Sequence, residues 1–109
     1  MRLFGWLRPS NENQDFAGQR VFYGGWGGYS FPRKPQDPIT RDEALSRVSY
    51  YVADYDDNGR LVQFDKFLEG EFEWGDTYTY FGDGKPNQRI ARMASGEKSV
   101  TDLDGSGSS

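Results

Sequence analysis

Residues 48–62 read VSYYVADYDDNGRLV, and this stretch predicts a strand, a tight turn and the start of a second strand. The run from Val48 to Ala53 is β-branched and aromatic with a period of two, which is typical of a strand with one buried face. Val48, Tyr50 and Val52 would share that face. The pair Asn58-Gly59 tolerates positive φ, as a type I′ turn requires. We therefore expect a β-hairpin centred on this pair.

The alternation continues towards residue 93. Leu61 to Leu68 predicts the returning strand, Glu69-Gly70 a second reversal, and residues 71–81 a third strand. On that strand one face is aromatic and the other acidic and polar, with Phe72, Trp74, Tyr78 and Tyr80 opposite Glu71, Glu73, Thr77 and Thr79. A turn at 82–85 leads to a closing strand at 88–93. The predicted fold is mainly β, or β-rich α+β, built as an antiparallel meander of hairpins.

The first half of the chain predicts less regular structure. Residues 20–23 favour a short strand, and the glycines that flank Trp26 indicate a bulge or a tight bend. Thr40 with Glu43 forms the pattern of a capping box, which predicts a short helix or turn near residues 40–46.

Composition limits the chemistry that this chain can perform. The 109 residues include no Cys and no His, so thiolate nucleophiles, disulfides and Ser-His or Cys-His arrangements are excluded. Aromatic residues reach 17%, and such rings contribute large buried areas and favour strands. An enzyme is therefore the least expected class, because its catalysis would depend on carboxylates, Lys, Tyr or a cofactor that no motif indicates.

Length and local composition predict one domain with two appendages. Residues 1–19 are expected to form an N-terminal appendage and loop, residues 20–94 a single β-rich domain, and residues 95–109 a disordered tail that ends in Gly and Ser. Arg8 and Pro9 interrupt the short N-terminal apolar run before a signal segment could form, and no later stretch is long and apolar enough to span a membrane. A cytoplasmic protein is therefore expected.

Two segments resemble known hairpin units. Residues 55–62, with Tyr55-Asp56, Asn58-Gly59-Arg60 and Leu61-Val62, and residues 78–85, with Tyr78-Thr79-Tyr80 and Gly82-Asp83-Gly84-Lys85, resemble the tyrosine-aspartate hairpins of Rhs-type proteins. The chain from about residue 20 to 93 looks still more like a bacterial domain of unknown function. This resemblance implies an immunity or antitoxin protein that occludes a basic toxin or effector partner, and it implies no catalytic residue.

The charge pattern predicts a contact surface for such a partner. Residues 1–39 carry five basic residues against three acids, whereas residues 40–109 carry eight against fourteen. An acidic body repels nucleic acid and suits a basic protein partner, although the same charge also serves ordinary solubility. We expect partner contacts on the acidic strand face and on exposed rings, at Glu69, Glu71, Glu73, Asp76, Trp74 and Trp26.

Calcium binding is the sharpest alternative. Asp54, Asp56, Asn58 and Gly59 match the first half of an EF-hand loop, and Asp65 stands at its twelfth position. An EF-hand needs flanking helices, however, and the period of two around the loop predicts strands. A glycan-binding module is the other alternative, in which exposed rings among Trp6, Trp26, Trp74 and the seven tyrosines form flat platforms for sugars. No cofactor is expected outside the calcium hypothesis.

Overall fold

The computed structural model describes residues 16–28 and 30–103. Most of the predicted N-terminal appendage, with Trp6, and the last six residues of the predicted tail lie outside this part. Within it, no helix is long and apolar enough to cross a membrane.

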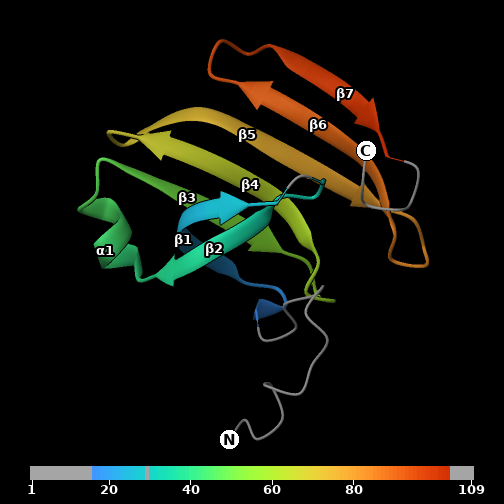
Figure 1. The fold of residues 1–109 in the computed structure, drawn as a ribbon, viewed down its shortest axis with the longest axis horizontal. Coiled ribbons are helices and arrows are strands. Elements are labelled where there is room, and N and C mark those ends of the chain that lie inside the picture. Colours follow the sequence, from blue (N-terminus) through green and yellow to red (C-terminus); the bar gives the residue numbers. More distant parts are fainter. Residues whose placement is uncertain (1–15, 29, 104–109) are drawn as a thin grey trace, which may run out of the picture.

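The fold is a seven-stranded antiparallel sheet with one short helix, so the predicted mainly β class is confirmed (Figure 1). The elements in chain order are β1 (Arg20–Gly27), β2 (Lys34–Ile39), α1 (Arg41–Leu45), β3 (Ser49–Tyr55), β4 (Leu61–Leu68), β5 (Glu71–Tyr80), β6 (Pro86–Met93) and β7 (Lys98–Asp102). The sheet order is β2-β1-β3-β4-β5-β6-β7, in which β3 to β7 form the predicted meander of hairpins with one additional strand.

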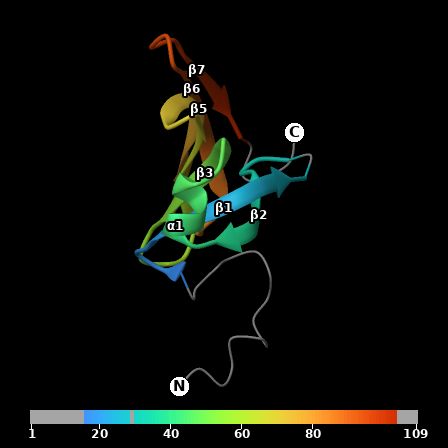
Figure 2. The ribbon, with the colours of Figure 1, turned by 90° about the vertical axis from the view of Figure 1, so that its left-hand side faces the viewer.

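Strand β1 bends between two partners. Its first half pairs with β3, from Arg20 opposite Asp54 to Tyr23 opposite Tyr51, and its second half continues along β2 as far as Gly27 opposite Lys34. The β1–β2 hairpin leaves the plane of the other strands, as the two perpendicular views show (Figures 1 and 2). The glycines around Trp26 lie in the outer half of β1, where the sequence predicted a bend.

The register divides the sheet into two faces, because residues that lie opposite each other on neighbouring strands point to the same side. One row runs through Val21, Ala53, Phe64 and Asp76, and we call this side the hairpin face because the β1–β2 hairpin packs over it. The next row runs through Phe22, Val52, Asp65 and Gly75, and we call this side the helix face because α1 packs against it.

Each face has its own apolar cluster. On the hairpin face the buried members are Tyr23, Ala53, Tyr55, Leu61, Phe64 and Tyr78. On the helix face Ala44 of α1 packs with Tyr50 and Val52, and Phe22, Ile39 and Phe67 surround them. The helix is short, as predicted, and the capping box is present: Thr40 Oγ1 accepts from the Glu43 amide at 3.1 Å.

The type I′ turn predicted at Asn58-Gly59 is not formed. At the β3–β4 turn only Gly59 has a positive φ, of 80°, and Asn58 does not. Both carboxylate oxygens of Asp56 accept hydrogen bonds, from the Asn58 and Arg60 amides and from Arg60 Nε, which favours a three-residue loop with Gly59 in the left-handed position. Positive φ at two successive residues, as a type I′ turn requires, occurs at Glu69 and Gly70 instead.

The prediction of a disordered tail from residue 95 is wrong for the described part. Lys98–Asp102 forms β7, which pairs with β6 along its whole length. Leu103 is buried and donates its amide to the Asn87 carbonyl at 2.7 Å. The isolated Val100 and Leu103 gave no periodic signal. The hairpin turn at Gly96 and backbone pairing with β6 are enough to order the strand.

Candidate functional site

The predicted acidic surface is only partly present. Glu69 and Glu71 are exposed at the β4–β5 turn. Glu73 is half-exposed, and its Oε1 lies 2.7 Å from Lys66 Nζ, so its charge is already paired. The ion pair also raises the pKa of Lys66, and the largest cause is the hydrogen bond to Glu73. The turn therefore presents two carboxylates to solvent rather than a row of four.

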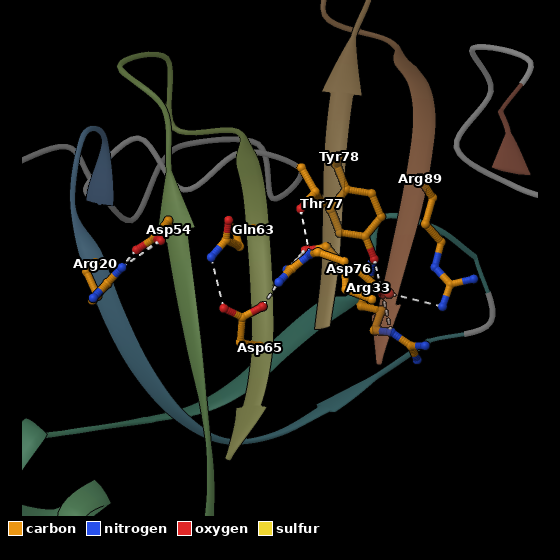
Figure 3. A network of polar contacts seen from close by, with 10 residues as sticks. Arg20, Arg33, Asp54, Gln63, Asp65, Asp76, Thr77, Tyr78 and Arg89 are labelled. Carbon is orange, nitrogen blue, oxygen red and sulfur yellow. Dashed lines mark hydrogen bonds and ion pairs between the residues drawn. The ribbon is translucent and has the colours of Figure 1, made fainter. Parts of the chain in front are cut away.

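The prediction that Asp76 belongs to this surface is wrong, because its side chain is 1% exposed and lies on the hairpin face (Figure 3). Asp76 Oδ2 accepts hydrogen bonds from Tyr78 Oη at 2.7 Å and Arg33 Nε at 2.6 Å, and Oδ1 lies 3.1 Å from Arg89 Nη2. The signal was available in the sequence, since an even-numbered residue between Trp74 and Tyr78 must point to the aromatic side of a strand.

The alternation on β5 also fails at its start. A bulge shifts the register between Lys66 and Phe67, so that Lys66 lies opposite Trp74 but Phe67 lies opposite Phe72. Phe72 therefore points to the helix face, where Phe67 packs edge-on against it with ring centroids 6.1 Å apart. The predicted aromatic face retains Trp74, Tyr78 and Tyr80 and loses Phe72.

Trp26 and Trp74 lie around Arg33. The Arg33 guanidinium carbon lies 4.2 Å from the Trp26 ring centroid and 4.8 Å from that of Trp74, and the two indoles meet edge to face. Arg33 and Arg89 also lie over the ring of Phe31. Two guanidinium groups and one carboxylate leave one excess positive charge in this cluster, and aromatic faces attract it. The tryptophans thus hold the β1–β2 hairpin on the sheet.

Two tyrosines of the hairpin face are held in their neutral form. Burial raises the pKa of Tyr78 well above its ordinary value, and the neighbouring charge of Asp76 raises it further. Burial likewise raises the pKa of Tyr23, which shares a 2.8 Å hydrogen bond with the hydroxyl of Tyr55. These phenols act as hydrogen-bond donors and acceptors in a packed core rather than as acids or bases.

A second polar network crosses the helix face (Figure 3). Arg20 on β1 makes two hydrogen bonds to Asp54 on β3, of 2.8 and 3.0 Å. Asp65 on β4 accepts from Gln63 and from Arg92, which reaches across β5 from β6 with a 2.5 Å contact. This contact passes over Gly75, where an added Cβ would overlap Asp65 Oδ1 and lie 2.8 Å from Arg92 Nη2.

The loop proposed for calcium is not built as an EF-hand. The loop is flanked by β3 and β4, not by helices, and the four proposed ligands have other partners or positions: Asp54 pairs with Arg20, Asp65 with Arg92, and Asp56 caps the turn that contains Asn58. Burial raises the pKa of Asp56, but hydrogen bonds from Arg60 and Asn58 outweigh it and lower the net value. Within residues 16–28 and 30–103 no cluster of three or more acidic residues could hold a metal ion.

A small cavity opens beside α1 on the helix face. Its volume is about 240 Å³, and its lining includes Arg20, Phe22, Arg41, Tyr50, Asp65 and Phe67. Ligand pockets usually enclose roughly 300–1,000 Å³. Two of its charged groups, Arg20 and Asp65, are already paired within the sheet, so this cavity is a weak candidate for a small-molecule site.

Exposed apolar residues at the end of α1 and beside the β4–β5 turn are a better candidate. Leu45 at the end of α1, Val48 before β3 and Leu68 at the end of β4 are all exposed, Val48 to 66%. The chain brings two of them to the turn, since Ser49 lies opposite Leu68 and the Glu69 amide donates to the Val48 carbonyl at 2.6 Å. We call Leu45, Val48, Leu68, Glu69 and Glu71 the acidic end.

The two glutamates of the acidic end were predicted from the sequence, but its three apolar residues were not. Val48 was expected on the buried face of a strand, whereas β3 begins only at Ser49. Leu68 was expected within the returning strand and is 37% exposed, at the last position before the turn. Their position at an element boundary is the signal that was available, because strand ends are where burial on either face stops.

A protein-family model matches most of the chain. The matching family model is described as a family of unknown function (DUF6156) and covers residues 15–109. No curated protein and no solved structure matches the chain. The match extends through β7, whereas the expected likeness ended near residue 93, and the predicted relation to Rhs-type hairpins and immunity proteins stays a prediction. The chain belongs to the DUF6156 family.

Proposed function

We propose that this chain is a protein-binding module whose contact surface is the acidic end. The observation that carries the proposal is the exposure of Val48 and Leu68 at the β4–β5 turn, with exposed Leu45 three residues before Val48. Glu69 and Glu71 at the same turn form no ion pair with any residue in 16–28 and 30–103. Exposed apolar residues grouped next to polar ones are typical of interaction sites.

The two kinds of residue would contribute differently to binding. The apolar side chains would be removed from water at the centre of the contact, which supplies most of the affinity. Glu69 and Glu71 would lie at the rim, where charge affects the rate of encounter and the choice of partner more than the affinity. The partner that fits this arrangement has an apolar anchor surrounded by Lys and Arg.

The resemblance to Rhs-associated hairpin domains supports a more specific form of the proposal. The partner would be a basic toxin or effector in the same cytoplasm, and binding would inhibit it by occluding its cationic substrate site. The chain would then act as an immunity or antitoxin protein and would need no catalytic residue of its own.

Affinity capture with matched charge variants tests the proposal. Glu69→Lys with Glu71→Lys reverses the charge of the acidic end, whereas Asp57→Lys with Asp83→Lys makes the same change in net charge at the β3–β4 and β5–β6 turns, which lie at the opposite end of the meander. Both control positions are exposed. We expect a basic protein to be captured by the original chain and by the control variant and to be lost from the acidic-end variant.

The purified partner then allows the affinity to be measured by calorimetry. Charge reversal at the acidic end should weaken it by about tenfold or more, and Leu68→Ser should weaken it further by removing apolar contact. Equal affinity for the acidic-end and control variants, or capture of no partner by the folded chain, would overturn the proposal.

A further inference from the structure

The two edges of the sheet differ in their capacity to pair with another strand. β2 carries Pro35 and Pro38, which have no amide hydrogen, and between them Asp37 has a positive φ of 66°. These features prevent regular pairing along that edge. β7 at the other edge has no proline and is exposed at every residue, and no other described strand pairs with its outer side (Figure 1).

The hydrogen bonds of the β6–β7 hairpin show which backbone groups of β7 point outward. The Met93 amide donates to the Glu97 carbonyl, and the Leu103 amide donates to the Asn87 carbonyl. In an antiparallel ladder such pairs recur at every second residue, so residues 97, 99, 101 and 103 direct their backbone groups towards β6. Lys98, Val100 and Asp102 therefore direct their N–H and C=O groups away from the sheet.

The sequence of this edge is complementary to itself. The strand reads Lys98-Ser99-Val100-Thr101-Asp102, with a cation at one end, a carboxylate at the other and an apolar residue at the centre. If a second copy is laid antiparallel with its Val100 opposite Val100, each Lys98 lies opposite an Asp102. The backbones of Lys98, Val100 and Asp102 then form hydrogen-bonded pairs with the second copy. Each Lys98 side chain also lies opposite the carboxylate of an Asp102.

We propose that two copies of this chain pair along β7, in this register, to form one continuous antiparallel sheet around a twofold axis at Val100. The surface is separate from the acidic end, and the proposal stands whether or not the proposed function holds. Both copies would use the same strand at this contact, so the interface is isologous, as a twofold dimer requires.

Side chains next to the edge favour the same arrangement. Ile90 on β6 lies opposite Val100, so the pairing would place an Ile90-Val100-Val100-Ile90 row across the axis on the helix face. Val100 is 60% exposed in the single chain and would be covered by its counterpart. Gln88 donates to Asp102 Oδ1 at 2.9 Å, which positions the carboxylate at the level of the edge.

Sedimentation analysis of a charge-swap cycle tests the register. A pairing of five-residue strands is small, so we expect a weak dimer, and the concentration series should run from about 1 µM to 1 mM. Lys98→Asp or Asp102→Lys alone places like charges opposite each other twice per dimer and should raise the dissociation constant by about tenfold. The double variant restores opposite charges and should return the constant to within about threefold of the original.

A matched proline pair tests the backbone contacts. Val100→Pro removes an amide that faces outward, so it should abolish the dimer and leave thermal stability nearly unchanged. Thr101→Pro removes an amide that faces β6 and should lower thermal stability. Lys34→Asp on β2 makes the same charge change as Lys98→Asp but lies outside the proposed contact, so it should leave the dimer intact.

The outcomes separate this dimer from other occupants of the edge. A chain that stays monomeric up to about 1 mM, the highest concentration of the series, overturns the proposal. A dimer that the charge-swap variants weaken without restoration overturns it as well, since the two copies would then pair in another register or through another segment. If Val100→Pro unfolds the chain, the charge-swap cycle still decides the matter.

Discussion

The two faces of the sheet use the same pair of groups, an arginine and an aspartate, in opposite surroundings. On the hairpin face Asp76 is 1% exposed and binds Arg33 and Arg89 beneath the β1–β2 hairpin. On the helix face Arg20 binds Asp54 with side chains that are 62% and 29% exposed. The geometry of the contacts is similar, with shortest distances of 2.6 Å and 2.8 Å, so burial is the main difference between them.

Burial changes what each pair contributes to stability. An exposed pair gains little, because water solvates both charges nearly as well when they are apart. A buried carboxylate that binds two cations contributes little net stability by its presence, but its removal leaves two partly buried guanidinium groups without a counter-ion. The two faces should therefore respond very differently to loss of the carboxylate.

Asp76→Ala is the largest expected effect. Its removal should lower the free energy of unfolding by about 3–5 kcal/mol, because Arg33 and Arg89 would remain in a weakly solvated site and the Tyr78 hydroxyl would lose its acceptor. Urea denaturation followed by tryptophan fluorescence measures this, and Trp26 and Trp74 beside Arg33 report on the same site.

A combined variant separates the buried charge from simple loss of packing. Asp76→Leu with Arg33→Met and Arg89→Met removes all three charges and keeps apolar volume in the site. It should recover a large part of the lost stability, because no unpaired charge is then buried. If it is as unstable as Asp76→Ala, the loss arises from packing and not from charge.

Gly75→Ala tests the crossing contact on the helix face. The added methyl carbon would lie 2.1 Å from Asp65 Oδ1 and displace the contact between Asp65 and Arg92. We expect a loss of about 1–3 kcal/mol from crowding and from the broken, half-buried ion pair, again measured by urea denaturation.

Gly25→Ala is the matched control for this substitution. Gly25 is also a strand glycine, and nothing lies within 4 Å of an added Cβ there. This variant should be close to neutral. In an Asp65→Ala background the cost of Gly75→Ala should largely disappear, since the displaced carboxylate is no longer present. An unchanged cost in that background would show that the backbone of β5, and not the ion pair, requires glycine.

Local sequence patterns were sufficient to predict the mainly β class and the meander from β3 to β6. The period of two in residues 48–93 predicted β3 to β6, and the Thr40 and Glu43 pair predicted the start of α1, because each depends on residues within a few positions of each other. Strand β7 was missed because its five residues have no apolar alternation and depend on β6 for their order.

The contacts of the candidate sites could not be predicted in the same way. Arg33 meets Asp76 across 43 positions, and this contact depends on how far the β1–β2 hairpin bends over the sheet, which no local pattern specifies. No local pattern specifies the bulge near Phe67 either, and this bulge turns Phe72 to the helix face. The parity of Asp76 on its strand was visible in the sequence, and it correctly indicates the buried side.

Asp54→Ala is the smallest expected effect and the most direct test of the comparison. The hydrogen bonds and charge of Asp54 raise the pKa of Arg20, but solvent screens a pair this exposed, so the loss of stability should be at most about 1 kcal/mol. That loss should shrink further in 1 M salt, where the screening length falls to about 3 Å, whereas the loss in Asp76→Ala should persist because solvent ions do not reach the buried site. Denaturation curves of the two variants at low and high salt measure both quantities. Equal losses with equal salt dependence would mean that the number of hydrogen bonds, and not burial, determines what these aspartates contribute.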